Sequence, residues 1–220
     1  MRRNNLGFTI VETMIAIGVF SLVASTATIV SIQLSKGYQQ AVIRSKLDTS
    51  ARNINNIFTQ AVQYTNATNM SSSPISSSDS SFAATGYPSN GGTWNVWCAG
   101  NIRISWQTSY GTTIFKNSLY QDNLGGYTDC LTQAFSLDTA QQLIPKDAFL
   151  PLFDITSASS IWELKMSIAT GDINSFRTPF ITADISTSPI TLPNCQDRNL
   201  ANFSFCGIVY YDNSVSSLVN

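Results

Sequence analysis

The feature that most constrains this chain is a run of 23 residues without a charged side chain, between Glu12 and Lys36. The run is rich in Ile, Leu, Val and Ala and contains no proline, which favours an α-helix. About 20 apolar residues are enough to cross the hydrocarbon core of a bilayer. Arg2 and Arg3 precede the run, and the positive-inside tendency keeps them in the cytoplasm and sends the chain after residue 34 across the membrane. We therefore expect a single-pass membrane segment followed by an exported body.

Two common kinds of segment fit this run in part. A secretory signal needs a small-residue cleavage site behind the apolar stretch, and Ser25-Thr26-Ala27 offers one. An uncleaved anchor needs only the observed length and charge pattern. Neither explains Glu12, because a carboxylate one turn into a bilayer segment costs roughly 2.5 to 3.5 kcal/mol unless it has a partner or lies at the interface.

The residues around Glu12 carry a family resemblance. A seven-residue leader with two arginines, then Gly7-Phe8-Thr9-Ile10-Val11-Glu12 and an apolar helix, resembles the cleavage and methylation signature of type IV pilins and pseudopilins. The resemblance implies that a prepilin peptidase cuts after Gly7 and methylates the new N-terminus at Phe8. Residues 1–7 are then a leader peptide, and residues 8–34 a transmembrane and assembly helix. It also implies a protein held in the inner membrane that passes into a cell-surface pilus or a periplasmic pseudopilus.

The same resemblance implies an assembly role for Glu12. In the family this carboxylate pairs with the N-terminal amine of a neighbouring subunit, and opposite charges attract strongly in a low dielectric, where an unpaired member is costly. The implied partners are other pilin subunits, both major and minor, the prepilin peptidase, an inner-membrane assembly platform and, before assembly, the membrane. Many pilins have a helix-loosening proline where this chain has Ile29, so we expect no such loosening here.

Beyond the membrane run the helical pattern continues. Apolar residues recur with the spacing of one helix face at Ile43, Leu47, Ala51, Ile54, Phe58 and Ala61. Residues 35–66 are therefore an amphipathic continuation, and a helix from residue 8 to about residue 65 would be roughly 85 Å long. That length exceeds a bilayer, so we expect the outer half to pack on the C-terminal body in the ladle shape of the family. A free coiled coil is the alternative, but the stripe is short and lacks alternating flanking charges.

The remainder of the chain reads as a linker and a β-rich head. Residues 71–81 contain eight serines and a proline, which indicates a flexible segment within a linker or loop at residues 67–91. From about residue 92 the period changes from 3.6 to 2, and the head covers residues 92–220. The expected strands are 102–106, 112–120, 150–155, 162–168, 180–185 and 203–211. The predicted fold class is α+β, with an antiparallel sheet packed on the long helix.

Four cysteines lie in the exported body, where an even count in an oxidising setting favours two disulfides over free thiols. Three connectivities are possible. Spacing favours Cys98 with Cys130 and Cys195 with Cys206, because each pair closes a separate loop. The second loop resembles the disulfide-bounded loop near pilin C-termini and is a candidate contact region for partners. No C-x-x-C pair is present, so we expect no metal site.

Two other features are interpreted as structural. Residues 122–129 are rich in oxygen ligands but lack the EF-hand spacing for calcium, so we predict a turn. Aromatic side chains at strand spacing are more often core than an adhesive platform, and we assign these residues to the core: Trp94, Trp97, Trp106, Tyr110, Tyr120 and Tyr127.

Composition excludes several classes of function. The chain has no histidine, which removes the commonest general base, and no nucleotide-binding loop or carboxylate pair stands out, so we expect neither an enzyme nor a cofactor. The net charge is -1, and from residue 71 onward eleven acidic residues outnumber six basic ones, which disfavours nucleic acid as a partner.

The function predicted from the sequence is that of a structural minor subunit of a type IV pilus, serving pilus assembly, adhesion or motility. The exported body is heavier than that of many major subunits, and it contains four cysteines; both features favour minor status. One alternative is a minor pseudopilin of a type II secretion system. The other is a membrane-anchored extracytoplasmic binding domain that does not polymerise.

Overall fold

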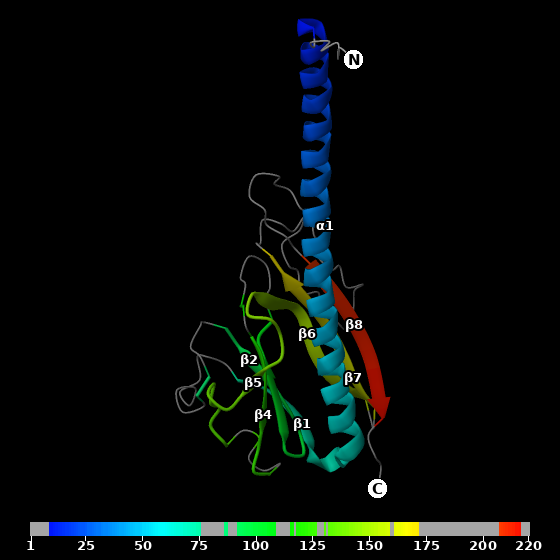
Figure 1. The fold of residues 1–220 in the computed structure, drawn as a ribbon. Helices are drawn as coiled ribbons and strands as arrows, with labels where there is room; N and C mark the ends of the chain where they lie inside the picture. Colours follow the sequence, from blue (N-terminus) through cyan, green and yellow to red (C-terminus); the bar gives the residue numbers. More distant parts are fainter. Residues whose placement is uncertain are drawn as a thin grey trace, which may run out of the picture. The chain divides into compact units, whose positions relative to one another are not determined.

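A computed structural model describes residues 9–75, 86–87, 92–108, 115–116, 118–126, 130, 132–158, 161–171 and 207–216. These residues form a long helix, a short 3-10 helix and two antiparallel sheets (Figure 1), which confirms the predicted α+β class. The chain divides into two compact units, Met1–Val42 and Ile43–Asn220, which are described separately below.

The helix α1 spans Ile10–Tyr64 and supplies all of the regular structure among the described residues of the first unit. It is unbroken at Ile29, as expected from the absence of proline there. α1 ends at Tyr64, within one residue of the predicted end at about residue 65. The short 3-10 helix η1 (Ala67–Asn69) follows, and the Asn66 side chain caps η1 by accepting a hydrogen bond from the Thr68 N–H at 3.3 Å.

In the second unit the last five turns of α1 bury one apolar stripe. Its fully buried members are Leu47, Ala51, Ile54, Phe58, Ala61 and Val62. Ile43 is partly buried and packs against the same core, so the predicted stripe is confirmed. The Phe58 ring lies 5.5 Å from the ring of Trp97, which anchors the helix to the first sheet.

The first sheet has five antiparallel strands in the order β1-β2-β3-β4-β5. They span Met70–Ile75, Trp94–Ala99, Ile102–Trp106, Leu119–Asn123 and Gln141–Gln142. Gly100 and Asn101 form the two-residue turn between β2 and β3, where Gly100 adopts a φ of 59°, a conformation that glycine tolerates without strain.

The start of the serine-rich segment is a strand, which corrects the predicted linker at residues 67–91. β1 pairs with β2 from Met70 opposite Ala99 to Ile75 opposite Trp94. β-propensity depends strongly on tertiary context. Pairing with the neighbouring strand β2 therefore stabilises an extended conformation that a run of serines would not adopt by its own propensity. Pro74 is tolerated because β1 lies at the edge of the sheet. Residues 76–85 lie outside the described part of the chain.

The second sheet has three antiparallel strands in the order β6-β7-β8, which span Ala148–Ala158, Ile161–Thr170 and Gly207–Ser216. The alternation predicted for residues 162–168 is confirmed, because Trp162, Leu164, Met166 and Ile168 enter the core that α1 also lines. The Asn213 side chain on β8 donates to Asn55 Oδ1 on α1 at 2.7 Å.

The two sheets meet in one hydrophobic core with α1. Trp106 on β3 donates its indole N–H to the Phe153 carbonyl oxygen on β6 at 3.0 Å, and the two rings are 4.9 Å apart. The indole is 4% exposed, so this hydrogen bond satisfies a polar group that would otherwise be buried without a partner. The contact fixes the two sheets to each other.

The predicted strands agree with the structure to different degrees. Residues 102–106 match β3, and residues 150–155 fall within the longer β6. Among the described residues of the predicted strand 112–120, only Leu119 and Tyr120 belong to a strand, β4, while Lys116 makes an isolated bridge to Phe149. β8 contains the described end of the predicted strand 203–211, and residues 203–206 lie outside the described part of the chain. Residues 180–185 lie outside the described part of the chain.

Candidate functional site

The helix that follows the predicted cleavage point begins with a reciprocal cap between Thr9 and Glu12. Glu12 Oε2 accepts hydrogen bonds from the Thr9 main-chain N–H at 2.9 Å and from the Thr9 hydroxyl at 3.0 Å. The Glu12 N–H in turn donates to Thr9 Oγ1 at 3.3 Å. This is a capping box, in which two residues three apart satisfy main-chain donors that a helix start leaves open. Glu12 therefore holds the first turn of α1 in place.

The hydroxyl groups along the apolar run bond to the helix itself. Ser21, Thr28 and Ser31 each donate to the carbonyl oxygen four residues earlier, at 2.8 Å. Ser25 does the same toward Ser21, and Thr26 donates to the Val23 carbonyl at 2.9 Å. Polar groups in a bilayer core need such internal partners because no water is available there. The serines and threonines are thus compatible with a membrane environment.

The same part of α1 presents an unusual amount of bare apolar surface. Side chains such as Ile10, Phe20 and Leu34 are 73–80% exposed. The helix is long and apolar enough to cross a membrane, with a mean hydropathy of 2.1 over its most apolar window. Large exposed apolar surfaces mark sites that contact a membrane or another protein. The segment fits a single-pass membrane anchor.

Two of the four predicted disulfide cysteines are joined in the structure. Cys98 on β2 and Cys130, in the region after β4, form a disulfide with a Cα–Cα distance of 6.0 Å, which confirms that predicted pair. Cys195 and Cys206 lie outside the described residues, and their pairing stays a prediction. Gly7 and Phe8, the predicted cleavage and methylation positions, also lie outside them.

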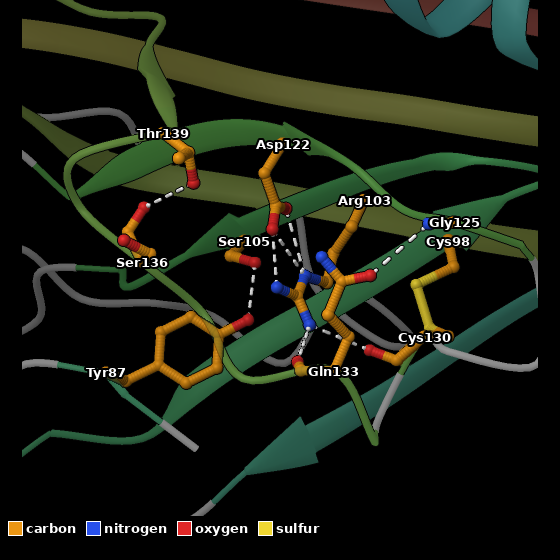
Figure 2. Close-up of polar contacts among 10 residues, drawn as sticks. All are labelled: Tyr87, Cys98, Arg103, Ser105, Asp122, Gly125, Cys130, Gln133, Ser136 and Thr139. Carbon is orange, nitrogen blue, oxygen red and sulfur yellow. Dashed lines mark hydrogen bonds and ion pairs between the residues drawn. A yellow bond between two sulfur atoms is a disulfide. The ribbon is translucent and has the colours of Figure 1, made fainter.

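A buried arginine secures the same region of the head (Figure 2). Arg103 on β3 is 1% exposed and pairs with Asp122, which lies directly opposite it on β4. Its Nε is 2.9 Å from Asp122 Oδ1, while its Nη1 donates to the carbonyl oxygens of Cys130 at 3.1 Å and Gln133 at 2.6 Å. The disulfide and the arginine therefore both hold Cys130, and the arginine also holds Gln133.

An aromatic stack covers this arginine. The Tyr87 ring lies 4.5 Å from Phe135 and 5.0 Å from Trp94, and the Phe135 ring lies 5.9 Å from the Arg103 guanidinium. The Tyr87 hydroxyl is 2.7 Å from Ser105 Oγ. Burial raises the pKa of Tyr87 to about 12. The stack and the ion pair make a second core on the face of the first sheet opposite α1.

The structure bears on two of these interpretations. Asp122 and Asn123 belong to β4 and not to the turn predicted for residues 122–129, because both pair with β3, and the Asp122 carboxylate is bound by Arg103. Residues 127–129 lie outside the described part of the chain. Four of the six aromatic residues assigned to the core are buried, namely Trp94, Trp97, Trp106 and Tyr120. Tyr110 and Tyr127 lie outside the described residues.

Two features of these sites were not predicted from the sequence: the cap at Thr9 and the ion pair of Arg103 with Asp122. Thr9 was not singled out, although a threonine three residues before a glutamate is the sequence pattern of a capping box. The pairing of Arg103 with Asp122 has no local signal, because it depends on the register of β3 with β4 across a segment of twelve residues between the two strands.

Comparison with known proteins identifies one region. Residues 2–28 match the prokaryotic N-terminal methylation motif, and no curated protein or solved structure matches the chain. The match includes Gly7, Phe8 and Glu12, and it ends within the apolar run of α1. The motif is the signal at which prepilin peptidase processes its substrates, and it implies assembly with other pilin subunits. The chain carries the prepilin-type signal of type IV pilins and pseudopilins.

Proposed function

We propose that this protein is a minor structural subunit of a type IV pilus, which is held in the inner membrane until its N-terminal helix enters the filament. The role is architectural, and no catalytic step is assigned to the head. The proposal covers pilus assembly, adhesion or motility, in which a head with its own disulfide is displayed outside the cell.

One observation carries this proposal: the exposed apolar part of α1, which the methylation motif overlaps, contains one charged residue, Glu12, between Thr9 and Ser35. In a simple membrane anchor the Glu12 carboxylate would serve only the cap with Thr9, and its charge would lack a counter-ion, which is costly in an apolar setting. An assembly in which the carboxylate meets a cation from a neighbouring subunit supplies the missing partner.

The geometry of Glu12 leaves room for such a partner. Both hydrogen bonds from Thr9 go to Oε2, and Oε1 has no hydrogen bond to the described part of the chain. A carboxylate accepts several hydrogen bonds at once, so the cap and an incoming ammonium group can be bound together. Cleavage after Gly7 would create that ammonium group on Phe8 of each subunit. The capping box would then hold the Glu12 carboxylate in one position for pairing with this ammonium group.

The test is mass spectrometry of the intact protein and its N-terminal peptide, recovered from sheared surface filaments and from membranes of the same cells. The expected result is a chain that begins with methylated Phe8 in the filament fraction. A chain that keeps Met1, or begins after Ala27, and stays out of filaments would replace the proposal with a plain anchor or a secreted domain.

A second measurement separates a pilus subunit from a secretion pseudopilin, because both would begin at methylated Phe8. Deletion of the gene is expected to reduce surface pili and leave the export of hydrolases intact. Loss of hydrolase export with normal pili would assign the chain to a type II secretion system instead.

A further inference from the structure

We propose that the second unit binds a neutral sugar in a cleft at the C-terminal end of α1. The cleft has a volume of about 340 Å³ and is partly open to solvent. Three elements line it: the last turn of α1, the loop through η1, and the turn between β2 and β3. Figure 1 shows the C-terminal end of α1 next to the start of β1.

The lining of the cleft carries polar groups but no charge. Gln60, Asn66, Asn69 and Asn101 contribute side-chain amides, and no lysine, arginine, aspartate or glutamate is among the lining residues. An amide offers both a hydrogen-bond donor and an acceptor, as does each hydroxyl of a sugar. An anionic or cationic ligand would leave its charge without a counterpart, so the chemistry favours an uncharged polyol.

Three of these amides are available for a ligand. The side chains of Gln60, Asn69 and Asn101 make no hydrogen bond to any residue within the described part of the chain. A site that uses neutral polar groups for recognition needs a few of them to converge on the ligand. Here they converge from α1, from η1 and from the β2–β3 turn.

An aromatic ring at the rim completes the pattern. Tyr64, the last residue of α1, is 84% exposed and lines the cleft. Its ring combines a flat apolar face with a hydroxyl group, which suits the face of a pyranose whose C–H groups lie on one side and hydroxyls at the edge. Ala61 and Ile102 form the apolar part of the lining.

The walls of the cleft are fixed before any ligand arrives. The Gly100 N–H donates to the Asn69 carbonyl oxygen at 3.0 Å, and the Asn69 N–H donates to the Asn66 carbonyl oxygen at 2.8 Å. A Cβ on Gly100 would lie 3.1 Å from Thr65 Oγ1, so the turn is in close contact with the end of α1. Such prior organisation lowers the entropy that binding costs.

A peptide ligand fits these observations less well. An extended peptide is usually held through a ladder of main-chain hydrogen bonds and pockets for alternate side chains. The cleft offers instead a compact group of side-chain amides around one ring. We therefore assign it to a saccharide and treat the peptide as an outcome of the test.

The test is saturation-transfer NMR on the full-length protein in detergent, with galactose, mannose and N-acetylglucosamine as neutral probes. Sialic acid and an uncharged, blocked trialanine peptide serve as the charged and peptide probes. We expect transfer of saturation from the protein to at least one neutral sugar, and no transfer to sialic acid or to the peptide. Tyr64→Ala is expected to weaken the response roughly three- to tenfold, as loss of a stacking ring does. Asn101→Ala should weaken it as well.

The matched control is Tyr38→Ala, since Tyr38 is also an exposed tyrosine of α1, at 71%, but does not line the cleft. This variant should bind as the wild type does. Failure of the wild type to bind any neutral sugar, equal binding by Tyr64→Ala, or a stronger response from the peptide would overturn the proposal. The measurement does not depend on polymerisation, so its outcome and that of the filament test are independent.

Discussion

Arg103 and Asp122 form a buried ion pair across the β3–β4 register, with Arg103 Nε 2.9 Å from Asp122 Oδ1. The same guanidinium donates to two main-chain carbonyl oxygens of the chain that follows β4. One side chain thus connects the sheet to the segment that Cys130 ties to β2. Its loss should affect both the pairing and that segment.

Arg103→Met is expected to lower the free energy of unfolding by about 3–5 kcal/mol, because it leaves the Asp122 carboxylate buried without a partner. The double variant Arg103→Met with Asp122→Leu should lose less than the single variant, since no uncompensated charge remains. Urea unfolding of the full-length protein in detergent, followed by tryptophan fluorescence, gives both values. A double variant that is less stable than the single one would contradict the charge argument.

Removal of the Cys98–Cys130 disulfide should cost about 2–4 kcal/mol, because the bond closes a loop with a sequence separation of 32 residues. The double variant Cys98→Ala with Cys130→Ala is compared with the wild type by thermal unfolding under oxidising conditions. Non-reducing peptide mapping of this variant also tests the predicted second pair. A Cys195–Cys206 peptide should be recovered from it, and recovery of two free thiols would refute that pairing.

The stability of the head should fall at alkaline pH because of Tyr87. Burial raises its pKa to about 12, above the ordinary value of 10.0, so the folded state holds the proton more tightly than the unfolded state. This contribution is complete below pH 10 and is lost as the pH rises toward 12. We expect the melting temperature of the wild type to drop over that range more steeply than that of Tyr87→Phe. Parallel curves for the two proteins would show that Tyr87 is not the responsible group.

Phe58→Ala should destabilise the second unit by about 3–5 kcal/mol, because it removes a fully buried ring that contacts Trp97. Gln63→Ala on the same helix is the control, since Gln63 is exposed and its substitution should change stability by less than about 0.5 kcal/mol. Both are measured by the urea titration used for Arg103. Equal stability of the two variants would mean that α1 does not depend on this contact.

Glu12→Gln separates the cap from the charge, because glutamine can keep the hydrogen bonds to Thr9 but cannot pair with an ammonium group. We expect normal export and cleavage, and a decrease of about tenfold or more in the filament fraction, corresponding to loss of roughly 1.4 kcal/mol or more. Glu12→Ala should show the same defect. Immunoblots of filaments and membranes give the ratio, and normal incorporation of Glu12→Gln would rule out pairing through charge.

The sequence predicted best those elements whose signals are local. The apolar stripe of α1 and the alternation of residues 162–168 follow from spacing alone, and both appear as expected. β2 was missed because both of its faces are buried: Trp97 faces the core with α1, while Trp94 faces the stack with Tyr87. A strand covered on both sides has no polar alternation to reveal it.

The parts of the candidate sites that were not predicted depend on contacts between distant residues. β1 is a strand because β2 lies beside it, and Arg103 is tolerated in the interior because Asp122 is opposite. The cleft beside Tyr64 joins a helix end to a turn more than thirty residues later, near Asn101. Propensity and spacing within a short window contain no information on such neighbours.

The hydroxyls of Ser21, Thr28 and Ser31 are bonded to the helix's own carbonyl oxygens, so their hydrogen bonds do not depend on what surrounds the helix. A segment of this kind behaves similarly in lipid and against an apolar protein surface. Transfer of the helix from lipid to an apolar protein surface therefore breaks none of these hydrogen bonds. The free-energy difference between the helix in lipid and the helix against protein then depends on side-chain packing and on the Glu12 carboxylate.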